Sequence, residues 1–471
     1  MEGNEQVAVS VIDIPAPAEE VVEEIREIRS NVFKLALPAI VRNIFQSAIG
    51  IVNTAVVGNL GTQPLAAVGI SNTLVDFVIM TFMALGIGAT ALVARHLGAK
   101  EQDAANAVAK QAVLICVCAS LVIGALFYLF PHKAIGMVMA LDKKGDPTVL
   151  SLGSSYLRIV SLTLPLALIM SVIGSISQGA GDMKTPMMIT GFINIINGFL
   201  CYALVYGAWS FPALGVNGAG IAAAIARGIG GILALAVIFS GRIPVRLFVG
   251  DRYRFDMPVI RRLMKVSIPA IVEQGVMQSS RIIYTVFVAG MGTMAVASNQ
   301  IAMTSQSISF MPGYGFSLAA TTLVGQSLGA KKPGRAELSG REANRMAMIL
   351  MAIMGVVFFF FSRPIVGFFT NDPDVIDLAA RCLKIVAISQ PALAVSMTMA
   401  GALRGAGDTK WVMFNTALGT YGVRLLFSYI LGIALGIGLT GVWYAMAADV
   451  ILRSVLAFRR FAAGRWKNIR V

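Results

Sequence analysis

The chain consists largely of long apolar stretches separated by short polar or glycine-containing connections. Each stretch reaches about 20 residues, the length that a helix needs to cross the hydrocarbon core of a bilayer. Short segments of alternating polarity, typical of a membrane β-barrel, do not recur. We therefore predict an all-α membrane protein with twelve transmembrane helices. Their predicted ranges are 32–57, 65–94, 107–131, 150–176, 187–209, 216–240, 263–290, 296–325, 343–361, 376–402, 411–436 and 440–462.

Two halves of the chain repeat the same pattern. Leu35-Ala-Leu-Pro-Ala-Ile-Val41 returns as Val266-Ser-Ile-Pro-Ala-Ile-Val272, an offset of 231 residues (269 − 38 for the two prolines). Gly-Ala-Gly-Asp at 179–182 returns at 405–408, an offset of 226, so one connecting loop differs in length. Parallel repeats of this kind are typical of transporters, in which one half rocks against the other around a site near the midplane.

The repeat predicts a domain organisation of two pseudo-symmetric six-helix bundles. We expect an N-lobe over 32–240, a cytoplasmic linker that acts as a hinge over 241–262, and a C-lobe over 263–462. Residues 1–31 lack a signal-peptide pattern and are expected to be a cytoplasmic tail. Within it, Glu19–Ile28 is either a short amphipathic helix on the cytoplasmic surface or part of a partly disordered chain. Residues 463–471 form a second, basic tail.

Composition and charge distribution agree with a membrane protein. The chain is 57% hydrophobic and only 13% charged, whereas a soluble chain carries about 25% charged residues. The net charge of +14 does not indicate a nucleic-acid partner, because the basic residues gather in every second connection. This positive-inside distribution predicts an inner-membrane protein with both termini in the cytoplasm. The clusters include Arg95, Lys100, Lys184, Arg242, Arg246, Arg254, Arg261, Arg262, Lys331, Lys332, Arg335, Arg404, Lys410, Arg459 and Arg460.

A series of motifs in order along residues 32–460 resembles the multidrug and toxic compound extrusion (MATE) family, near its bacterial DinF-like branch. The motifs are Val57-Gly-Asn-Leu-Gly61, Leu97-Gly-Ala99, Gln178-Gly-Ala-Gly-Asp182, Pro269-Ala-Ile-Val-Glu273, Phe310-Met-Pro-Gly-Tyr-Gly-Phe316, Thr322-Leu-Val-Gly-Gln-Ser-Leu-Gly-Ala330 and Gly438-Leu-Thr-Gly-Val-Trp443. The resemblance implies an antiporter that exports small organic, often lipophilic and cationic, compounds against an inward flow of protons or sodium ions. We expect no cofactor or metal, a small-molecule substrate, a surrounding lipid bilayer and a monomer.

The chain departs from the family pattern in the N-lobe. Members usually carry an Asp in the first helix, in a Val-Asp-Thr context, where this chain has Asn53. A second usual Asp, four residues after an Asn in the fifth helix, corresponds to Cys201 after Asn197. Neither an amide nor a buried thiol titrates as a carboxylate does, so this half lacks the family's carboxylate pair.

Glu273 is the first candidate for coupling transport to an ion gradient. A charge in mid-bilayer costs about 2.5–3.5 kcal/mol on insertion scales, so it requires a functional or structural reason. Glu273 follows Pro269 by one helical turn, where the helix can bend. Its alternative role is structural, in a salt bridge to Arg42, its counterpart in the repeat, or to Arg281.

Asp76 is the second candidate, because it is the only carboxylate in the middle of an N-half helix. Together with Asn53 it can replace the missing N-lobe site, or it can simply belong to a polar seam between helices. Among the other intramembrane charges, Arg424 and Asp449 are expected to form an ion pair. Three other basic residues lie near the ends of predicted helices and are expected to extend to the membrane surface: Lys384, Arg453 and Arg227.

A set of polar, aromatic and methionine side chains is predicted to line a substrate cavity, since promiscuous binding sites often use Met and aromatic residues. The alternative is that they pack the helices or hydrogen-bond them together. The set comprises Arg42, Gln46, Asn194, Asn197, Met277, Gln278, Arg281, Tyr284, Asn299, Gln300, Met303, Phe310, Met311 and Tyr314.

Other classes of function fit the sequence less well. An intramembrane enzyme or metalloenzyme is disfavoured because the two histidines, His96 and His132, belong to no ligand-spacing motif. A channel would show a repeated filter or charge ring, and none is present. A flippase of lipid-linked oligosaccharides, or an exporter of anions, stays an alternative because Arg42, Arg227 and Arg281 are intramembrane cations.

Overall fold

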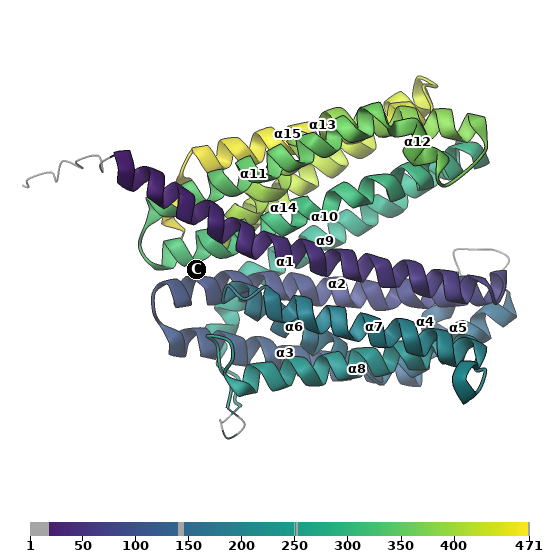
Figure 1. The fold of residues 1–471 in the computed structure, drawn as a ribbon, viewed down its shortest axis with the longest axis horizontal. Coiled ribbons are helices and arrows are strands. Elements are labelled where there is room, and N and C mark those ends of the chain that lie inside the picture. The colour runs from purple at the N-terminus through teal and green to yellow at the C-terminus, as the bar shows by residue number, and fades with distance from the viewer. Residues whose placement is uncertain (1–17, 140–145, 249, 251–252, 470–471) are drawn as a thin grey trace, which may run out of the picture.

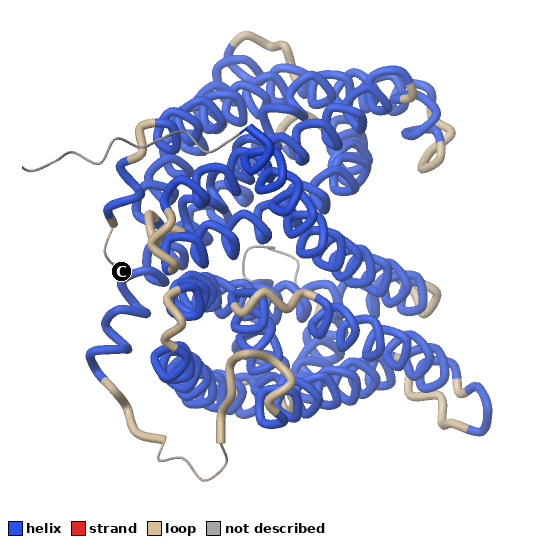
Figure 2. Tube along the Cα trace, turned by 60° about the vertical axis from the view of Figure 1, so that its left-hand side comes forward, coloured by secondary structure: helices blue, strands red, loops and turns tan. Residues whose placement is uncertain are grey.

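The computed structural model describes residues 18–139, 146–248, 250 and 253–469, and the regular structure over these residues is entirely helical (Figure 2). The first half contains α1 (Ala18–Gly58), α2 (Thr62–Gly98), α3 (Gln102–Leu129), α4 (Pro131–Met139), α5 (Pro147–Ser161), α6 (Leu164–Gly179), α7 (Lys184–Tyr206), η1 (Ala208–Ser210) and α8 (Val216–Ser240). The second half contains α9 (Met257–Ala289), α10 (Thr293–Gly329), α11 (Pro333–Phe360), α12 (Ser362–Gly367), α13 (Pro373–Gly405), α14 (Thr409–Ala417), η2 (Leu418–Leu425), η3 (Ser428–Ala434), α15 (Leu439–Ala462) and η4 (Arg465–Asn468).

The predicted twelve-helix membrane architecture is confirmed. Within the described residues, nine helices are long and apolar enough to span a membrane, and the bent pair α5–α6 makes a tenth. The remaining two of the twelve predicted spans correspond to α9 and α10, which are 33 and 37 residues long. These two carry the polar residues that the sequence assigns to the site, among them Glu273, Gln278, Arg281 and Gln300, and their composition is therefore less lipid-like.

Two predicted helices have irregular geometry. The predicted helix 150–176 is bent by 57° between α5 and α6, just before Pro165, whose ring cannot fit inside a continuous helix without displacing the preceding turn. The predicted helix 411–436 winds as a π-helix over Leu418–Leu425 and Ser428–Ala434. Such widened turns frequently occur at functional sites.

The two halves form two bundles that exchange the first parts of their first helices (Figure 1). In α1, Ile28 and Val32 are buried in a core cluster with Phe316 and other residues of the second half. In α9, Leu263 belongs to the core cluster of the first half, and the Ser267 hydroxyl donates to the Leu85 carbonyl at 3.2 Å. Helices α1 and α9 therefore cross between the bundles, and any rocking motion must act on both of them.

Helix α1 begins earlier than expected. The predicted tail 1–31 is helical from Ala18 onward, continuous with the first span, which corrects the alternative of disordered chain over that part; residues 1–17 lie outside the described residues. Two ion pairs tie this extension to α11: Arg29 Nε to Glu342 at 2.6 Å, and Arg335 Nη2 to Glu27 at 2.7 Å. The extension is therefore fixed on the second half.

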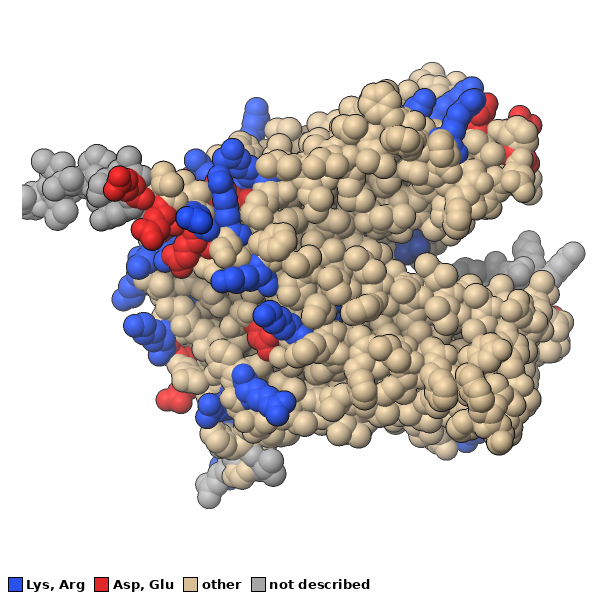
Figure 3. All heavy atoms as spheres, viewed as in Figure 1, with Lys and Arg blue, Asp and Glu red and all other residues tan. Residues whose placement is uncertain are grey.

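The two bundles meet tightly at one end, which also carries most of the charged side chains and is called the basic end below (Figure 3). Gly98 of α2 and Gly329 of α10 pack so closely that an added methyl group would overlap the carbonyls of Gln326 and Arg95, respectively. The Thr322 hydroxyl donates to the Gln178 carbonyl at 2.9 Å across the same contact. These close approaches seal the basic end.

At the opposite end the bundles separate, and the space-filling surface is hollowed between them (Figure 3). The tube view from another direction shows the same divergence of the helix ends (Figure 2). The structure is therefore closed at the basic end and open at the other.

Candidate coupling and substrate site

Glu273 is held by two other helices of the second half. It lies in α9 and is 7% exposed. Its Oε1 accepts hydrogen bonds from Arg404 Nη2 at 2.6 Å and from the Thr416 hydroxyl at 3.0 Å. Arg404 ends α13 and Thr416 lies in α14, so one carboxylate joins three helices. Charge-assisted hydrogen bonds of this length are among the strong ones in proteins.

The partner of Glu273 is not the one that the sequence suggested. Neither Arg42 nor Arg281 forms an ion pair among the described residues, and Arg404, predicted as one of the surface basic residues, turns inward with its side chain 20% exposed. The repeat contains a signal for this: the counterpart of Arg404 is the uncharged Gln178 (404 − 226), so the charge is specific to the second half.

Near Glu273, α9 lacks a backbone hydrogen bond and changes its neighbours. Pro269, one turn earlier, lies inside the helix and removes a backbone hydrogen bond there. One turn later, Gln278 Nε2 contacts Met80 Sδ of α2 at 3.3 Å. Arg281, one turn further along α9, is exposed. Within a few turns, α9 therefore changes from residues that pack against α2 of the first half to residues that are exposed.

A second charged cluster lies deep in the C-lobe. Asp449 is 0% exposed and pairs with Arg424 at 2.9 Å and with Arg453 at 2.8 Å. The expected Arg424–Asp449 pair is confirmed, whereas Arg453 does not extend alone to the membrane surface. Next to it, Asn299 Oδ1 accepts from the Tyr284 hydroxyl at 2.6 Å and from the Trp443 indole at 3.1 Å.

The interior of the N-lobe has polar groups with few protein partners. Side-chain atoms of Asn53, Asn194, Asn197 and Arg227 are buried without a hydrogen-bond partner in the protein. Buried polar atoms of this kind are usually satisfied by water or a ligand. Arg227, predicted to extend toward the membrane surface, instead has a buried guanidinium nitrogen.

Tyr156 connects this interior to the Asp76 side of α2. The Tyr156 hydroxyl donates to Asn72 Oδ1 at 3.1 Å. Asp76 and Arg227 are within electrostatic range of each other and of Tyr156, without direct ion-pair contact among the described residues. Cys201, in the place of the family carboxylate, is buried and also near Tyr156. Tyr156 carried no signal in the sequence, because aromatic residues are common inside helical bundles.

The remaining predicted cavity residues fall into groups. Tyr284, Asn299 and Met303 belong to the C-lobe interior, where Met303 packs against the core. Arg42 is half-buried and lies near Tyr314 of α10, where α1 crosses the other bundle. The exposed members are Gln46, Arg281, Gln300 and Phe310, and the half-buried ones include Asn194, Asn197, Met277, Gln278 and Met311. These positions are distributed over both lobes and their interface rather than around one closed pocket.

Comparisons with known proteins identify the family. The family model named MatE matches residues 38–203 and 269–430. A probable multidrug resistance protein NorM of Thermotoga maritima is 31% identical over 448 residues, covering 95% of each chain. An uncharacterized transporter YisQ of Bacillus subtilis is 27% identical over 437 residues, covering 93% of this chain and 94% of that protein.

Solved structures share the fold. The Vibrio cholerae MATE transporter VcmN in its bent form has a TM-score of 0.85 and 20% identity, covering 95% of this chain and 99% of that chain. A transporter of the MOP superfamily from Pyrococcus furiosus has a TM-score of 0.84 and 20% identity, covering 94% and 98%. Family and relatives are transporters rather than enzymes. Together with the two-lobed architecture, these matches establish that the chain is a multi-pass membrane protein and belongs to the MATE family of multidrug efflux transporters.

Proposed function

We propose that this transporter is a cation-coupled antiporter, driven by protons or sodium ions, which exports small lipophilic organic cations by alternating access. The basic end faces the cytoplasm, so the structure corresponds to an outward-open state. Glu273 carries the coupling, and the N-lobe position Asn53 does not.

The observation that carries this proposal is the position of Glu273. It is buried one turn after Pro269, in a helix that begins in one bundle and continues in the other, and it accepts from Arg404 and Thr416. A group can shift a conformational equilibrium only through interactions that differ between the two states. Bending α9 at Pro269 would change the distances between Glu273 and its two partners, and this supplies the required difference.

Ion binding competes with the ion pair. A proton on Glu273 neutralises the carboxylate, and a sodium ion would share its oxygen with the Thr416 hydroxyl; either weakens the attraction to Arg404. The Arg404 guanidinium then requires another partner or solvent, which favours a rearranged α9–α13 contact. Return of the carboxylate to Arg404 releases the ion. Antiport follows if the substrate binds the conformation in which this ion pair is formed, because ion and substrate then favour different states.

The substrate would bind where α9, α10 and α2 leave their mutual contact. Met277 of α9 and Met311 and Tyr314 of α10 are half-buried, and Gln278 of α9 contacts Met80 of α2. Flexible thioether side chains adapt to apolar ligands of different shape. This supports a broad range of lipophilic substrates.

Two intramembrane arginines favour a second candidate function, the export of anions. Arg42 and Arg281 lie within membrane-spanning helices and have no ion-pair partner among the described residues. Unpaired cations in a cavity attract anions and repel cations. Export of an anionic or lipid-linked substrate is therefore the alternative.

Transport into inverted vesicles separates the two candidates. The expected result is uptake of a fluorescent organic cation that is driven by a pH gradient, a sodium gradient, or both. A fluorescent organic anion of similar size serves as the matched probe. Uptake of the anion but not of the cation would establish the alternative, and uptake of neither would reject both.

A further inference from the structure

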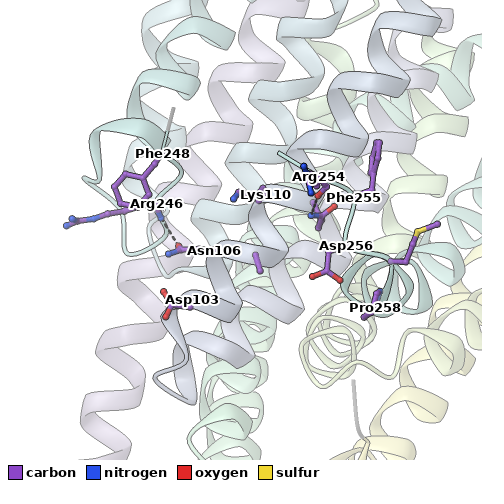
Figure 4. A pocket seen from close by; sticks show the side chains of 12 residues that line it. Asp103, Asn106, Lys110, Arg246, Phe248, Arg254, Phe255, Asp256 and Pro258 are labelled. Atoms are coloured by element: carbon purple, nitrogen blue, oxygen red, sulfur yellow. Dashed lines mark hydrogen bonds between the residues drawn. The ribbon is translucent and has the colours of Figure 1, made fainter. Parts of the chain in front are cut away.

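A pocket of about 750 Å³ lies at the basic end, away from the central site, between α3 and the segment that connects the two halves. Figure 4 shows Asp103, Asn106 and Lys110 along α3, with Arg254, Phe255 and Asp256 on the segment that leads into α9. The full set of lining residues also includes Ala107, Gln111, Arg246, Phe248, Met257 and Pro258.

The wall formed by the connecting segment is fixed, not a loose hinge. Three amide side chains of α3 bind its backbone: Gln102 donates to the Pro244 carbonyl at 2.7 Å, Gln111 donates to the Arg254 carbonyl at 2.8 Å, and Asn106 accepts from the Arg246 N–H at 2.8 Å. Ile243, Val245 and Leu247 are buried in the N-lobe core. The predicted linker 241–262 is therefore largely docked on the N-lobe, with residues 249 and 251–252 outside the described part. The helix α9 begins within it, at Met257.

Positive charge prevails in this pocket. Lys110, Arg246 and Arg254 contribute three basic groups against the carboxylates of Asp103 and Asp256. The Asp256 side chain caps α9 by accepting from the Val259 N–H at 3.3 Å, so it is already engaged. Lys110 of α3 and Arg254, just before α9, both line the pocket, and two basic groups suit a ligand with a negatively charged phosphate.

A second pocket, of about 460 Å³, adjoins the first and is entirely apolar. Its lining is Ile115, Phe255, Met257, Ile260 and Met264, so Phe255 and Met257 line both pockets. Along α3 the polar positions 103, 106 and 110 are followed by Ile115. Ile115 is twelve residues after Asp103 (115 − 103), about 18 Å along the helix at 1.5 Å per residue. The apolar pocket therefore lies on the membrane side of the basic one.

We propose that the two pockets form one binding site for an anionic phospholipid of the cytoplasmic leaflet. The phosphate lies near Lys110 and Arg254, and an acyl chain lies in the groove between α3 and α9. Basic pockets between helices on the cytoplasmic side suit anionic headgroups, and the apolar groove distinguishes a lipid from a free anion or an acidic peptide. Both walls of this site pack against the N-lobe core, because the first part of α9 crosses into that bundle. The lipid therefore contacts the N-lobe and the start of the helix that continues into the C-lobe.

Lipid binding to the purified full-length protein tests the proposal. Native mass spectrometry in detergent measures retention of phosphatidylglycerol and of phosphatidylcholine, for the wild type and for Lys110→Gln/Arg254→Gln. Both substitutions leave the backbone contacts of the segment in place. We expect the wild type to prefer phosphatidylglycerol, and the double variant to lose this preference by on the order of tenfold. Unchanged preference in the double variant would overturn the proposal.

Two further measurements complete the test. The control Arg261→Gln/Arg262→Gln removes two exposed charges from the start of α9 outside both pockets. It should retain the preference for phosphatidylglycerol, and an equal loss would mean a diffuse surface-charge effect instead of a site.

Ile260→Gln tests the apolar groove and should weaken retention of both lipids while keeping the preference for phosphatidylglycerol. Excess inorganic phosphate should not displace phosphatidylglycerol from the wild type. Displacement would identify a free-anion site and contradict the lipid assignment.

Discussion

The interiors of the two halves occupy equivalent places in the repeat but differ in how their polar groups are satisfied. Tyr284 of the C-lobe corresponds to Asn53 of the N-lobe (284 − 231). Tyr284 donates a 2.6 Å hydrogen bond to Asn299, whereas Asn53 Oδ1 is buried without a protein partner. The C-lobe also holds its carboxylates in direct ion pairs, Asp449 with Arg424 and Glu273 with Arg404.

The two halves therefore share a scaffold but not its chemistry. In the N-lobe, amide and thiol groups stand where the family usually carries carboxylates, and Asp76 and Arg227 interact only at longer range. In the C-lobe, every described intramembrane carboxylate has a guanidinium in contact. We infer that ion coupling is confined to the C-lobe, while the N-lobe offers polar groups to ligands.

The largest expected effect on stability comes from Asp449→Asn. The substitution leaves Arg424 and Arg453 buried beside a neutral amide, and an uncompensated buried charge typically costs about 3–5 kcal/mol. Thermal unfolding of the purified protein measures the loss. The control is Arg363→Gln, which removes an exposed ion pair with Asp377 and should cost about 0–1 kcal/mol. Equal stabilities of the two variants would show that the buried cluster does not stabilise the C-lobe.

The seal at the basic end should be sensitive to added volume in either half. Gly329→Ala places a methyl group against the Arg95 carbonyl, and overpacking of this kind costs about 1–3 kcal/mol. The closed end should open more often, raising thiol labelling of a cysteine introduced there at Gln326. Gly275→Ala, which meets nothing within 4 Å, is the matched control. Labelling that rises equally in both variants would argue against the seal.

Asp76→Asn shows whether the N-lobe contributes to coupling. If Asp76 only belongs to a polar seam with Tyr156 and Arg227, its neutralisation should slow export by a few-fold while gradient-driven accumulation persists. The measurement is accumulation of substrate in inverted vesicles at steady state, separate from the initial rate. Loss of accumulation with a normal rate of passive exchange would move the coupling role to the N-lobe.

The smallest effect is expected from Asn53→Asp, which restores one family carboxylate. The new acid lacks its usual partner in the fifth helix, where Cys201 stands, so export should be unchanged or reduced by about twofold, corresponding to ~0.4 kcal/mol. The double variant Asn53→Asp/Cys201→Asp serves as the comparison. A clear gain of coupled export by Asn53→Asp alone would show that the N-lobe already holds a nearly complete ion site.

The sequence was sufficient for the twelve-helix fold and the two related halves, because span length and the repeated motifs can be recognised without knowing which helices are in contact. The Arg424–Asp449 pair was also predicted and is confirmed, whereas the coupling role of Glu273 stays a prediction. The sequence did not locate Arg404, because a basic residue at a helix end has the same pattern whether it faces solvent or turns inward. The sequence left the helix over Glu19–Ile28 as one of two alternatives, because the stability of this first part of α1 depends on packing and ion pairs with α11, far away in the chain.

Glu273→Gln in proteoliposomes shows whether Glu273 couples transport to the ion gradient. The amide keeps the size and an acceptor for Thr416 but removes the charge that pairs with Arg404. The measurement compares gradient-driven accumulation with passive counterflow of the same labelled substrate. We predict that accumulation collapses while counterflow persists, because binding and exchange do not require the titrating group. Accumulation at the wild-type level in this variant would contradict the account.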